Sequence, residues 1–544
     1  MRSTVPGSAP GHAVPSSDIV THERRTTMDN VPTLSPPPRR HGIRRPATSA
    51  AAHAAGSRRL NHGLKKNSLG VPSIFFYIIA AASPLTVVVA LYPIIIGAGN
   101  GIGMPGAFVI AAVVLMIFAV GYVAMSRHVT NAGAFYAYVT LGLGRITGLG
   151  SASLAIFAYN AIQAGLYGGF GYYASELLNP VLGVAIPWWV YAFVALLACL
   201  GLGVQGVHSG AKVLGVFMTL EVTMITVLSV FSLFGGNEPV SRFSLEPFAP
   251  SAVLGGALGV ALMFAHASFI GFEGSAIYGE EARDPARTIP RATYLSIAFM
   301  GTLYAISGWL IMNALGLDEV VSIATDTGGN FIFAASDTII GHNISVLFQI
   351  LIVTATFAAI VTFHNNVSRY LFSLGRQGLV WKPLGWTLPR RQTPWVASIV
   401  QSAMVGIVIV AFAVAGLDPF ATLFTWATGI GTIGVIFSQL VAGVAIFVFF
   451  RRSDVDKRRW NTVIAPILAV VGLSAFFVLT LNSLDILLGV QGAVAAIMVS
   501  LVFVALLAGM AYGAYLRFVA PDKYELVGKA LNERELDEPA PEAM

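Results

Sequence analysis

Charged residues are scarce in this sequence, and cysteine is almost absent. Only 11% of the 544 residues are charged and 56% are hydrophobic, whereas soluble domains carry about 25% charged residues. The one cysteine, Cys199, excludes an internal disulfide and any metal site built from several thiolates. So low a fraction of charged residues is not typical of a soluble protein.

Apolar segments recur along the chain, and each is long enough to cross a hydrocarbon layer of about 30 Å as a helix. Backbone N–H and C=O groups must be bonded internally in hydrocarbon, which requires helices here, since a β-barrel would show short alternating segments. The predicted fold is therefore an all-α polytopic membrane protein with about 12 transmembrane helices. We place the spans at 72–96, 105–125, 147–176, 187–206, 210–234, 251–279, 293–316, 344–373, 396–416, 420–450, 462–484 and 490–516.

Basic residues are concentrated in alternate loops. The loops that follow even-numbered spans hold 16 lysines and arginines, whereas the loops that follow odd-numbered spans hold only Arg242. Lysine and arginine are enriched in cytoplasmic loops, so the N-terminus is expected in the cytoplasm, as is the C-terminus after an even number of spans. We predict a multi-pass protein of the cell (plasma) membrane.

Two polar tails flank the apolar region. Residues 1–70 are rich in proline, serine and arginine and hold 11 basic residues against three acids, a composition typical of a disordered basic cytoplasmic tail. This tail lacks the apolar core of a signal peptide, and a start at Met28 would remove residues 1–27. We expect the transmembrane domain at 71–517 and a second cytoplasmic tail at 518–544. The other basic residues lie in short loops, so nucleic-acid binding is not expected.

Span 1 contains a proline near its middle. Pro84 lacks a backbone N–H and clashes with the preceding turn, while the neighbouring Ser83 and Thr86 can bond freed backbone groups or a ligand. Secondary transporters often bind substrate where a helix is interrupted near the middle of the membrane. An ordinary proline kink in a continuous helix is the alternative interpretation.

Span 6 shows a second interruption. Gly271 and Gly274 weaken the helix, and His266 and Ser268 place polar groups at depth. Spans 1 and 6 correspond to each other if spans 1–5 and 6–10 are inverted repeats. The N-termini of the half-helices would then offer N–H groups to a carboxylate, and the facing carbonyl ends would suit an ammonium group. Together these groups predict a receptor for a zwitterion.

The candidate substrate site combines residues of the two interruptions with polar residues of span 3. Asn160 and Gln163 share one helical face with Tyr167, and this face is expected to point inward because lipid would reject amides. For His266, a satisfied core histidine is the alternative to a role in binding. The predicted substrate-binding residues are Ala82, Ser83, Pro84, Leu85, Thr86, Asn160, Gln163, Phe264, His266, Ala267, Ser268 and Phe269.

One motif resembles a known family. The tripeptide Gly271-Phe272-Glu273, the Glu280-Glu281 pair and the segment from Ile289 to Ala292 resemble the signature of the amino acid–polyamine–organocation (APC) permeases, and the resemblance covers roughly residues 65–515. It implies the five-plus-five inverted repeat of the leucine transporter with two further helices: repeat one at about 72–234, repeat two at about 251–450 and the extra helices at about 462–516. Span 1 departs from the glycine-rich break of many members, which leaves the geometry of carboxylate binding and the choice of substrate open.

Two acidic residues, Glu221 and Glu273, lie within predicted spans. Glu221 lies deep in span 5, where a charge costs about 2.5–3.5 kcal/mol on insertion scales. The family resemblance implies a titratable group on helix 5, which makes Glu221 the candidate for proton coupling. Its alternative role is a hydrogen bond between helices. Glu273 lies nearer the cytoplasmic end of span 6, and we expect it to pair with a loop arginine.

The resemblance implies secondary active transport of amino acids or related amines. Proton-driven uptake by a symporter is our first expectation, an amino acid/amine antiporter the second, and a membrane sensor or channel the third. We expect a small-molecule substrate, protons and the lipid bilayer as partners. The glycine-rich segment 97–103 resembles a dinucleotide loop but lacks a βαβ setting, so no cofactor is expected. No nucleophile–base pair or metal cluster lies at membrane depth, so we do not expect an enzyme.

Overall fold

The computed structural model describes residues 69–128, 135–205, 207–278, 281–389, 391–453, 455–483 and 493–528. Almost all of the predicted N-terminal tail, and residues 529–544 of the predicted C-terminal tail, lie outside the described residues. Within the described ranges the chain is helical, and its β-structure is a single isolated bridge between Leu69 and Ala282. The protein is therefore an all-α polytopic membrane protein, as predicted.

All twelve predicted spans coincide with helical segments. In the described part of the chain, nine segments are long and apolar enough to cross a membrane: Val71–Ala98, Gly101–Ser126, Trp188–Gln205, Pro285–Leu315, His342–Arg376, Trp395–Val414, Pro419–Arg452, Trp460–Asn482 and Ala496–Val519. The other three predicted spans correspond to α7 (Arg145–Leu182), α9 (Val207–Phe231) and α11 (Leu258–Ala267). Glycine and polar residues lower the hydropathy of α7, and α11 is short because span 6 is interrupted.

Most spans are single helices, whereas spans 1 and 6 are divided. Span 1 consists of α2 (Val71–Ala82), α3 (Pro84–Thr86), the π-helical turn η1 (Val87–Leu91) and α4 (Tyr92–Ala98). Span 6 consists of α10 (Pro250–Val253), α11 and α12 (Gly274–Ile277). The remaining spans are α5 (Met104–Ser126), α8 (Trp188–Gln205), α13 (Pro285–Leu315), α16 (His342–Arg376), α17 (Trp395–Val414), η7 with α18 (Pro419–Phe424 and Thr425–Arg452), η8 with α19 (Trp460–Ile464 and Ala465–Asn482) and α21 (Ala493–Val519).

Shorter helices connect the spans. Helix α6 (Phe135–Leu143) precedes span 3, and α14 (Val320–Thr327) and α15 (Phe331–Ile339) lie between spans 7 and 8. The start of the predicted C-terminal tail forms α22 (Pro521–Leu526). Glycines with positive φ precede several helices, such as Gly144 before α7 and Gly341 before α16, because a backbone with positive φ favours a residue without a side chain.

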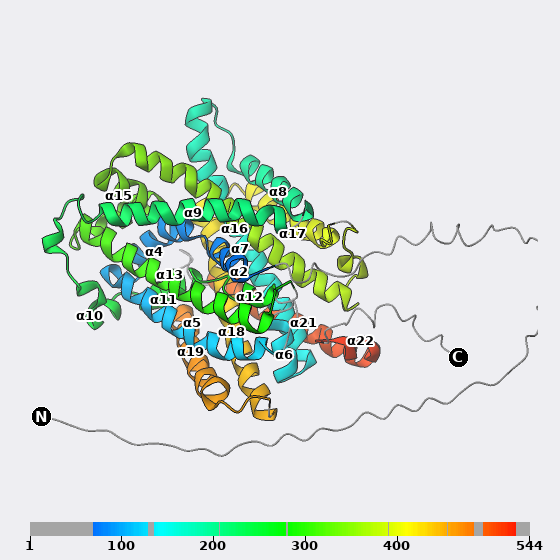
Figure 1. Cartoon of the computed structure of the whole chain (residues 1–544). Coiled ribbons are helices and arrows are strands. Elements are labelled where there is room, and N and C mark those ends of the chain that lie inside the picture. Colours follow the sequence, from blue (N-terminus) through cyan, green and yellow to red (C-terminus); the bar gives the residue numbers. More distant parts are fainter. Residues whose placement is uncertain are drawn as a thin grey trace, which may run out of the picture. The chain divides into compact units, whose positions relative to one another are not determined.

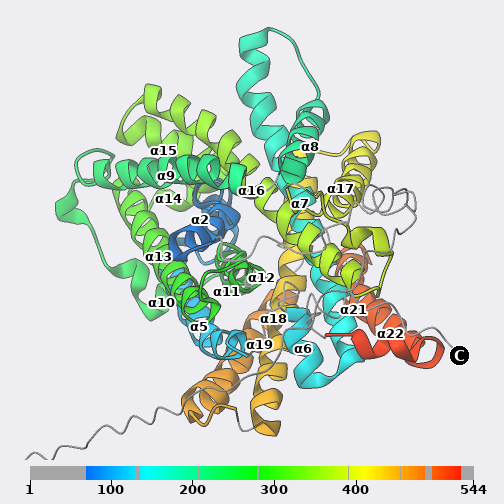
Figure 2. The ribbon, with the colours of Figure 1, turned by 45° about the vertical axis from the view of Figure 1, so that its right-hand side comes forward.

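The first half of span 1 lies inside the helix bundle (Figure 1). Helix α2 contacts α9, α13 and α16, and its second half from Tyr77 to Ala82 is buried. Helix α7 packs against α16, α18 and α21, and α19 packs against α18 and α5 (Figure 2). The peripheral helices α8, α17, α19 and α21 expose apolar side chains such as Leu197, Ile407 and Val471. Such an apolar outer surface suits contact with lipid.

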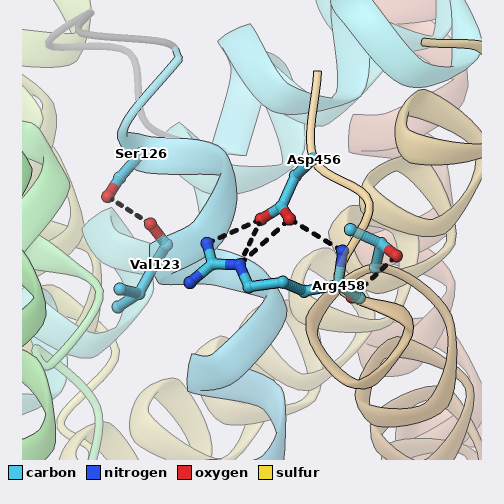
Figure 3. Close-up of polar contacts among 5 residues, drawn as sticks. Val123, Ser126, Asp456 and Arg458 are labelled. Atoms are coloured by element: carbon cyan, nitrogen blue, oxygen red, sulfur yellow. Dashed lines mark hydrogen bonds and ion pairs between the residues drawn. The ribbon is translucent and has the colours of Figure 1, made fainter. Parts of the chain in front are cut away.

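The loop before η8 carries a local ion pair (Figure 3). The Arg458 guanidinium lies 2.7 Å from Asp456 Oδ2, and the Arg458 backbone N–H also donates to Asp456 at 2.9 Å. This arginine holds the pKa of Asp456 below its usual range. At the adjacent end of α5, the Ser126 hydroxyl donates to the Val123 carbonyl at 2.9 Å. The bonds between Asp456 and Arg458 hold the backbone turn that leads into span 11.

Candidate functional site

The interruption of span 1 lies at Ser83. Helix α2 ends at Ala82, Ser83 adopts the left-handed φ of 46°, and α3 begins at Pro84. Left-handed backbone is costly for a residue other than glycine, and it persists only where the surroundings hold it. The Ser83 hydroxyl is hydrogen-bonded to Thr86 Oγ1 at 2.7 Å and lies 3.2 Å from the Ala355 carbonyl of α16. The helix is therefore divided at Ser83 and is not simply kinked by proline.

Glu221 of α9 lies at the start of the second half of span 1. Its Oε2 atom is 3.4 Å from the backbone nitrogen of Leu85, and the residue is 1% exposed. Leu85 N–H is one of the donors that the beginning of a helix leaves without an internal partner. The partial positive charge at a helix N-terminus also favours a carboxylate. Glu221 thus connects span 5 to the interruption of span 1.

The interruption of span 6 touches that of span 1. Helix α11 ends at Ala267, α12 begins at Gly274, and turns connect them. Gly271 lies in these turns and has a φ of +116°. A Cβ atom at this position would lie 2.6 Å from the Ala81 Cβ of α2. Glycine is therefore required both by the backbone conformation and by the close approach of the two spans.

Glu273 is bound inside the bundle, and the expectation that it pairs with a loop arginine is wrong. Its carboxylate accepts hydrogen bonds from the Tyr159 hydroxyl at 2.6 Å and the Gly271 N–H at 3.1 Å. The Tyr122 hydroxyl donates to the Glu273 carbonyl at 2.6 Å. Because α11 ends early, the turns that follow it hold Glu273 among the tyrosines of α5 and α7. A nearby acid, Glu281, pairs with an arginine instead and lies 2.9 Å from Arg369.

A cavity of about 60 Å³, which we call the central cavity, lies beside the two interruptions. Spans 1, 3, 6, 8 and 10 contribute to its wall. Five of the predicted site residues line it: Ala82, Ser83, Thr86, Phe264 and Ala267. The other lining residues are Ala81, Val87, Leu91, Ile162, Leu166, Ile270, Phe363, Phe424, Thr428 and Thr432. These fifteen residues carry hydroxyl and apolar groups, and none of them has an ionisable side chain.

The remaining predicted site residues are not among those that line the central cavity. Pro84 and Leu85 are buried within the interruption of span 1. Three polar side chains bond to helix groups instead: Asn160 donates to the Ile156 carbonyl, Ser268 donates to the Phe264 carbonyl, and Gln163 is hydrogen-bonded to Gln401. His266 lies 2.8 Å from Gln439 Oε1, and the Phe269 ring packs against Tyr304.

Span 10 contributes site residues that the sequence analysis missed. Phe424, Thr428 and Thr432 follow one face of the helix at intervals of four residues. The hydroxyls of both threonines donate to carbonyls of their own helix, at 2.5 Å and 2.7 Å. Two threonines spaced by four residues inside an apolar span were the available signal. They were overlooked because span 10 shows no interruption in its sequence.

Polar and aromatic contacts close the side of the bundle that carries the basic loops. The Arg369–Glu281 ion pair is buried, and the guanidinium lies 4.8 Å from the centre of the Tyr278 ring. Tyr278 in turn stacks on Tyr77 of α2 at 4.9 Å. The Leu69 N–H donates to the Glu281 carbonyl at 3.1 Å. These contacts join the start of span 1, the loop after span 6 and the end of span 8.

Comparison with known proteins agrees with this architecture. A family model described as amino acid permease matches residues 69–507, which is most of the chain. The chain belongs to the amino acid permease family. The match confirms the predicted APC membership and shows a multi-pass transporter rather than an enzyme.

Two relatives of this amino acid permease have informative names. It is 24% identical to the branched-chain amino acid permease BcaP of Bacillus subtilis over 407 residues, which cover 70% of this chain and 80% of the relative. It is 23% identical to the low-affinity putrescine importer PlaP of Escherichia coli over 316 residues, which cover 55% of this chain and 66% of the relative. One relative is thus named for amino acids and the other for a diamine.

Proposed function

We propose that this permease takes up neutral amino acids with small or branched apolar side chains, by proton-coupled alternating access. The observation that carries the proposal is the wall of the central cavity, which combines apolar side chains with hydroxyls next to two interrupted helices. Apolar walls with a few oriented polar groups are typical of small-molecule sites. The name of the relative BcaP supports the same substrate class.

The polar ends of an amino acid have partners in the interrupted helices. The end of α2 leaves backbone carbonyls for an ammonium group, and the partial positive charge at the start of the next half-helix favours a carboxylate. A diamine would need an anionic partner at each end. No residue in the described wall of the central cavity is acidic, so this site favours a zwitterion over a diamine.

Coupling to protons is proposed through Glu221. Its carboxylate and the substrate carboxylate would both lie near the N-terminal end of the half-helix that begins after Ser83. Two anions in one desolvated site repel each other, so bound substrate favours a protonated Glu221. By linkage, protonation of Glu221 favours substrate binding to the same extent. This reciprocity is what a symporter requires.

The orientation follows from the distribution of basic loops. We place the side with these loops in the cytoplasm and the protein in the cell membrane, with both termini inside. The Arg369–Glu281 pair and the Tyr77–Tyr278 stack then close the cytoplasmic route from the central cavity. Release of substrate into the cell would require these contacts to open.

Transport in proteoliposomes tests the proposal. Vesicles with an imposed inward proton gradient should accumulate labelled leucine, and an unlabelled panel of alanine, valine, leucine and isoleucine should compete. Collapse of the gradient should abolish accumulation and leave counterflow intact. If uptake requires unlabelled amino acid inside the vesicles at every proton gradient, the protein is an antiporter instead. Transport of putrescine without transport of neutral amino acids would refute the substrate class.

A further inference from the structure

The hydroxyls in the wall of the central cavity have no hydrogen left to donate to a ligand. The Ser83 hydroxyl donates to the Ala355 carbonyl, so Thr86 is the donor in the 2.7 Å bond between Ser83 and Thr86. The other two hydroxyls in the wall, those of Thr428 and Thr432, donate to carbonyls of span 10. A hydroxyl has one donor and two acceptor lone pairs, so each of them can still accept a bond. The side chains of the described wall therefore offer a ligand hydrogen-bond acceptors and no donor.

Both branches of the Thr428 side chain hold it in one orientation. The hydroxyl donates to the Phe424 carbonyl at 2.5 Å. The methyl lies against Gly165 of α7, where an added Cβ atom would come within 2.6 Å of the methyl carbon. Rotation of the side chain would break the bond and move the methyl away from α7, so the hydroxyl oxygen stays an acceptor. Thr428 is half-buried, whereas the other three hydroxyl residues of the wall are buried, which leaves Thr428 the most accessible of the four.

The proposed binding mode directs a substrate side chain toward this threonine. The ammonium and carboxylate groups are proposed to lie at the interrupted helices, where Ser83 and Thr86 line the cavity. The part of the wall that spans 1 and 6 do not supply consists of Ile162, Leu166, Phe363, Phe424, Thr428 and Thr432. A side chain on this side of the cavity therefore meets apolar groups and the oxygens of two threonines.

Resting on the proposed uptake of neutral amino acids, we infer that Thr428 accepts a hydrogen bond from the substrate side chain and so selects for a side-chain hydroxyl. Threonine has nearly the shape of valine, with a hydroxyl in place of one methyl. This hydroxyl donates to the Thr428 oxygen, which replaces a hydrogen bond that the substrate made to water. Threonine is therefore a substrate beside the apolar amino acids, although its side chain is polar.

The same wall rejects a carboxamide. Asparagine has nearly the shape of leucine, but its side-chain carbonyl needs a donor, and no side chain in the described wall supplies one. A desolvated acceptor without a partner weakens binding. A wholly apolar wall would behave differently, because it disfavours an added hydroxyl by about a hundredfold. Acceptance of the hydroxyl together with rejection of the carboxamide is thus the signature of a wall that offers only acceptors.

Initial rates of uptake by the full chain in proteoliposomes test the inference, with labelled valine, threonine, leucine and asparagine. The kcat/KM for threonine should lie within about tenfold of that for valine, and the kcat/KM for asparagine should lie at least about tenfold below that for leucine. Thr428→Val keeps the shape of the side chain and removes the acceptor. The ratio of kcat/KM for threonine to that for valine should therefore fall about tenfold in this variant. The ratio is independent of the amount of active protein.

Two further variants control for effects that do not involve the acceptor. Thr362 of span 8 is buried, donates to the Ala358 carbonyl at 3.0 Å and is not among the residues that line the central cavity. Thr362→Val should therefore leave the threonine-to-valine ratio unchanged. Thr428→Ser keeps the hydroxyl and removes only the methyl, so it should retain a higher ratio than Thr428→Val.

The outcomes separate this inference from the proposed function. Uptake of valine and leucine with an unchanged threonine-to-valine ratio in Thr428→Val would overturn the inference and leave the proposed function standing. An equal fall of the ratio in Thr362→Val, or uptake of asparagine as efficient as that of leucine, would do the same. Absence of both valine and leucine uptake would overturn the proposed function, and the inference with it.

Discussion

A methyl group added at Gly271 tests whether the contact between spans 1 and 6 sets the geometry of the site. The backbone at Gly271 has a φ of +116°, and the new methyl would lie 2.6 Å from the Ala81 methyl. Strained backbone costs about 1–3 kcal/mol, and overpacking costs about 1–3 kcal/mol. Gly271→Ala should therefore lower the free energy of unfolding by about 2–6 kcal/mol and abolish most uptake, because the two interruptions are displaced.

A matched control separates these two costs. Gly301 of α13 has no unusual φ, yet a Cβ atom there would lie 2.7 Å from the Ala112 methyl of α5. Gly301→Ala should therefore cost only the packing part, about 1–3 kcal/mol, and should retain more transport than Gly271→Ala. Adding Ala81→Gly to Gly271→Ala should recover the packing part, less about 1 kcal/mol for a glycine in a helix.

Unfolding in detergent and uptake in proteoliposomes are the measurements. The reasoning fails if Gly271→Ala retains wild-type stability and uptake. It also fails in part if Ala81→Gly recovers nothing in the Gly271→Ala background, because the methyl–methyl contact would then carry no energy. Equal effects of Gly271→Ala and Gly301→Ala would show that the left-handed backbone contributes nothing.

Three further changes have definite expected results. Glu221→Gln should abolish accumulation driven by a proton gradient and spare counterflow in the same vesicles; normal accumulation would leave Glu221 with a packing role only. Ser83→Leu should fill the central cavity and abolish substrate binding without reducing the amount of protein in the membrane; unchanged substrate affinity would place the site elsewhere. Glu281→Gln removes the carboxylate partner of the buried Arg369 cation and should cost about 3–5 kcal/mol of stability. Adding Arg369→Met to Glu281→Gln should recover most of this loss. A double variant with the same thermal midpoint as Glu281→Gln would contradict the pairing.

The fold was largely predictable because the bilayer constrains it. A helix must cross about 30 Å of hydrocarbon with its backbone bonded internally. Apolar length therefore predicted nine helices that are long and apolar enough to cross a membrane, and it placed the other three predicted spans on helical segments of the described chain. The interruption at Ser83 was also predictable, because Pro84 removes a donor from the middle of an apolar helix. Composition and one proline thus predict the helical spans and the position at which the first span divides.

The rotation of each span about its axis was not predictable. Polar and apolar residues are mixed around helix α7, so its sequence does not indicate which side points inward. Asn160 and Gln163 were expected at the central cavity, whereas Ile162 and Leu166 line it. The role of Glu273 was missed for a related reason. A continuous helix would have carried this residue toward a loop, and only the early end of α11 leaves it among buried tyrosines.

Ser83 shows how span 1 divides without the glycine-rich sequence of many family members. Its left-handed backbone is costly for serine, so neighbouring groups must hold it. Within span 1 the hydroxyl bonds Thr86, and across the bundle it bonds the Ala355 carbonyl of span 8. Movement of α2 against α16 would break this last bond and remove one support of the left-handed backbone. The serine therefore links the conformation of the site to the relative position of spans 1 and 8, a link that glycine, with no side chain, would not provide.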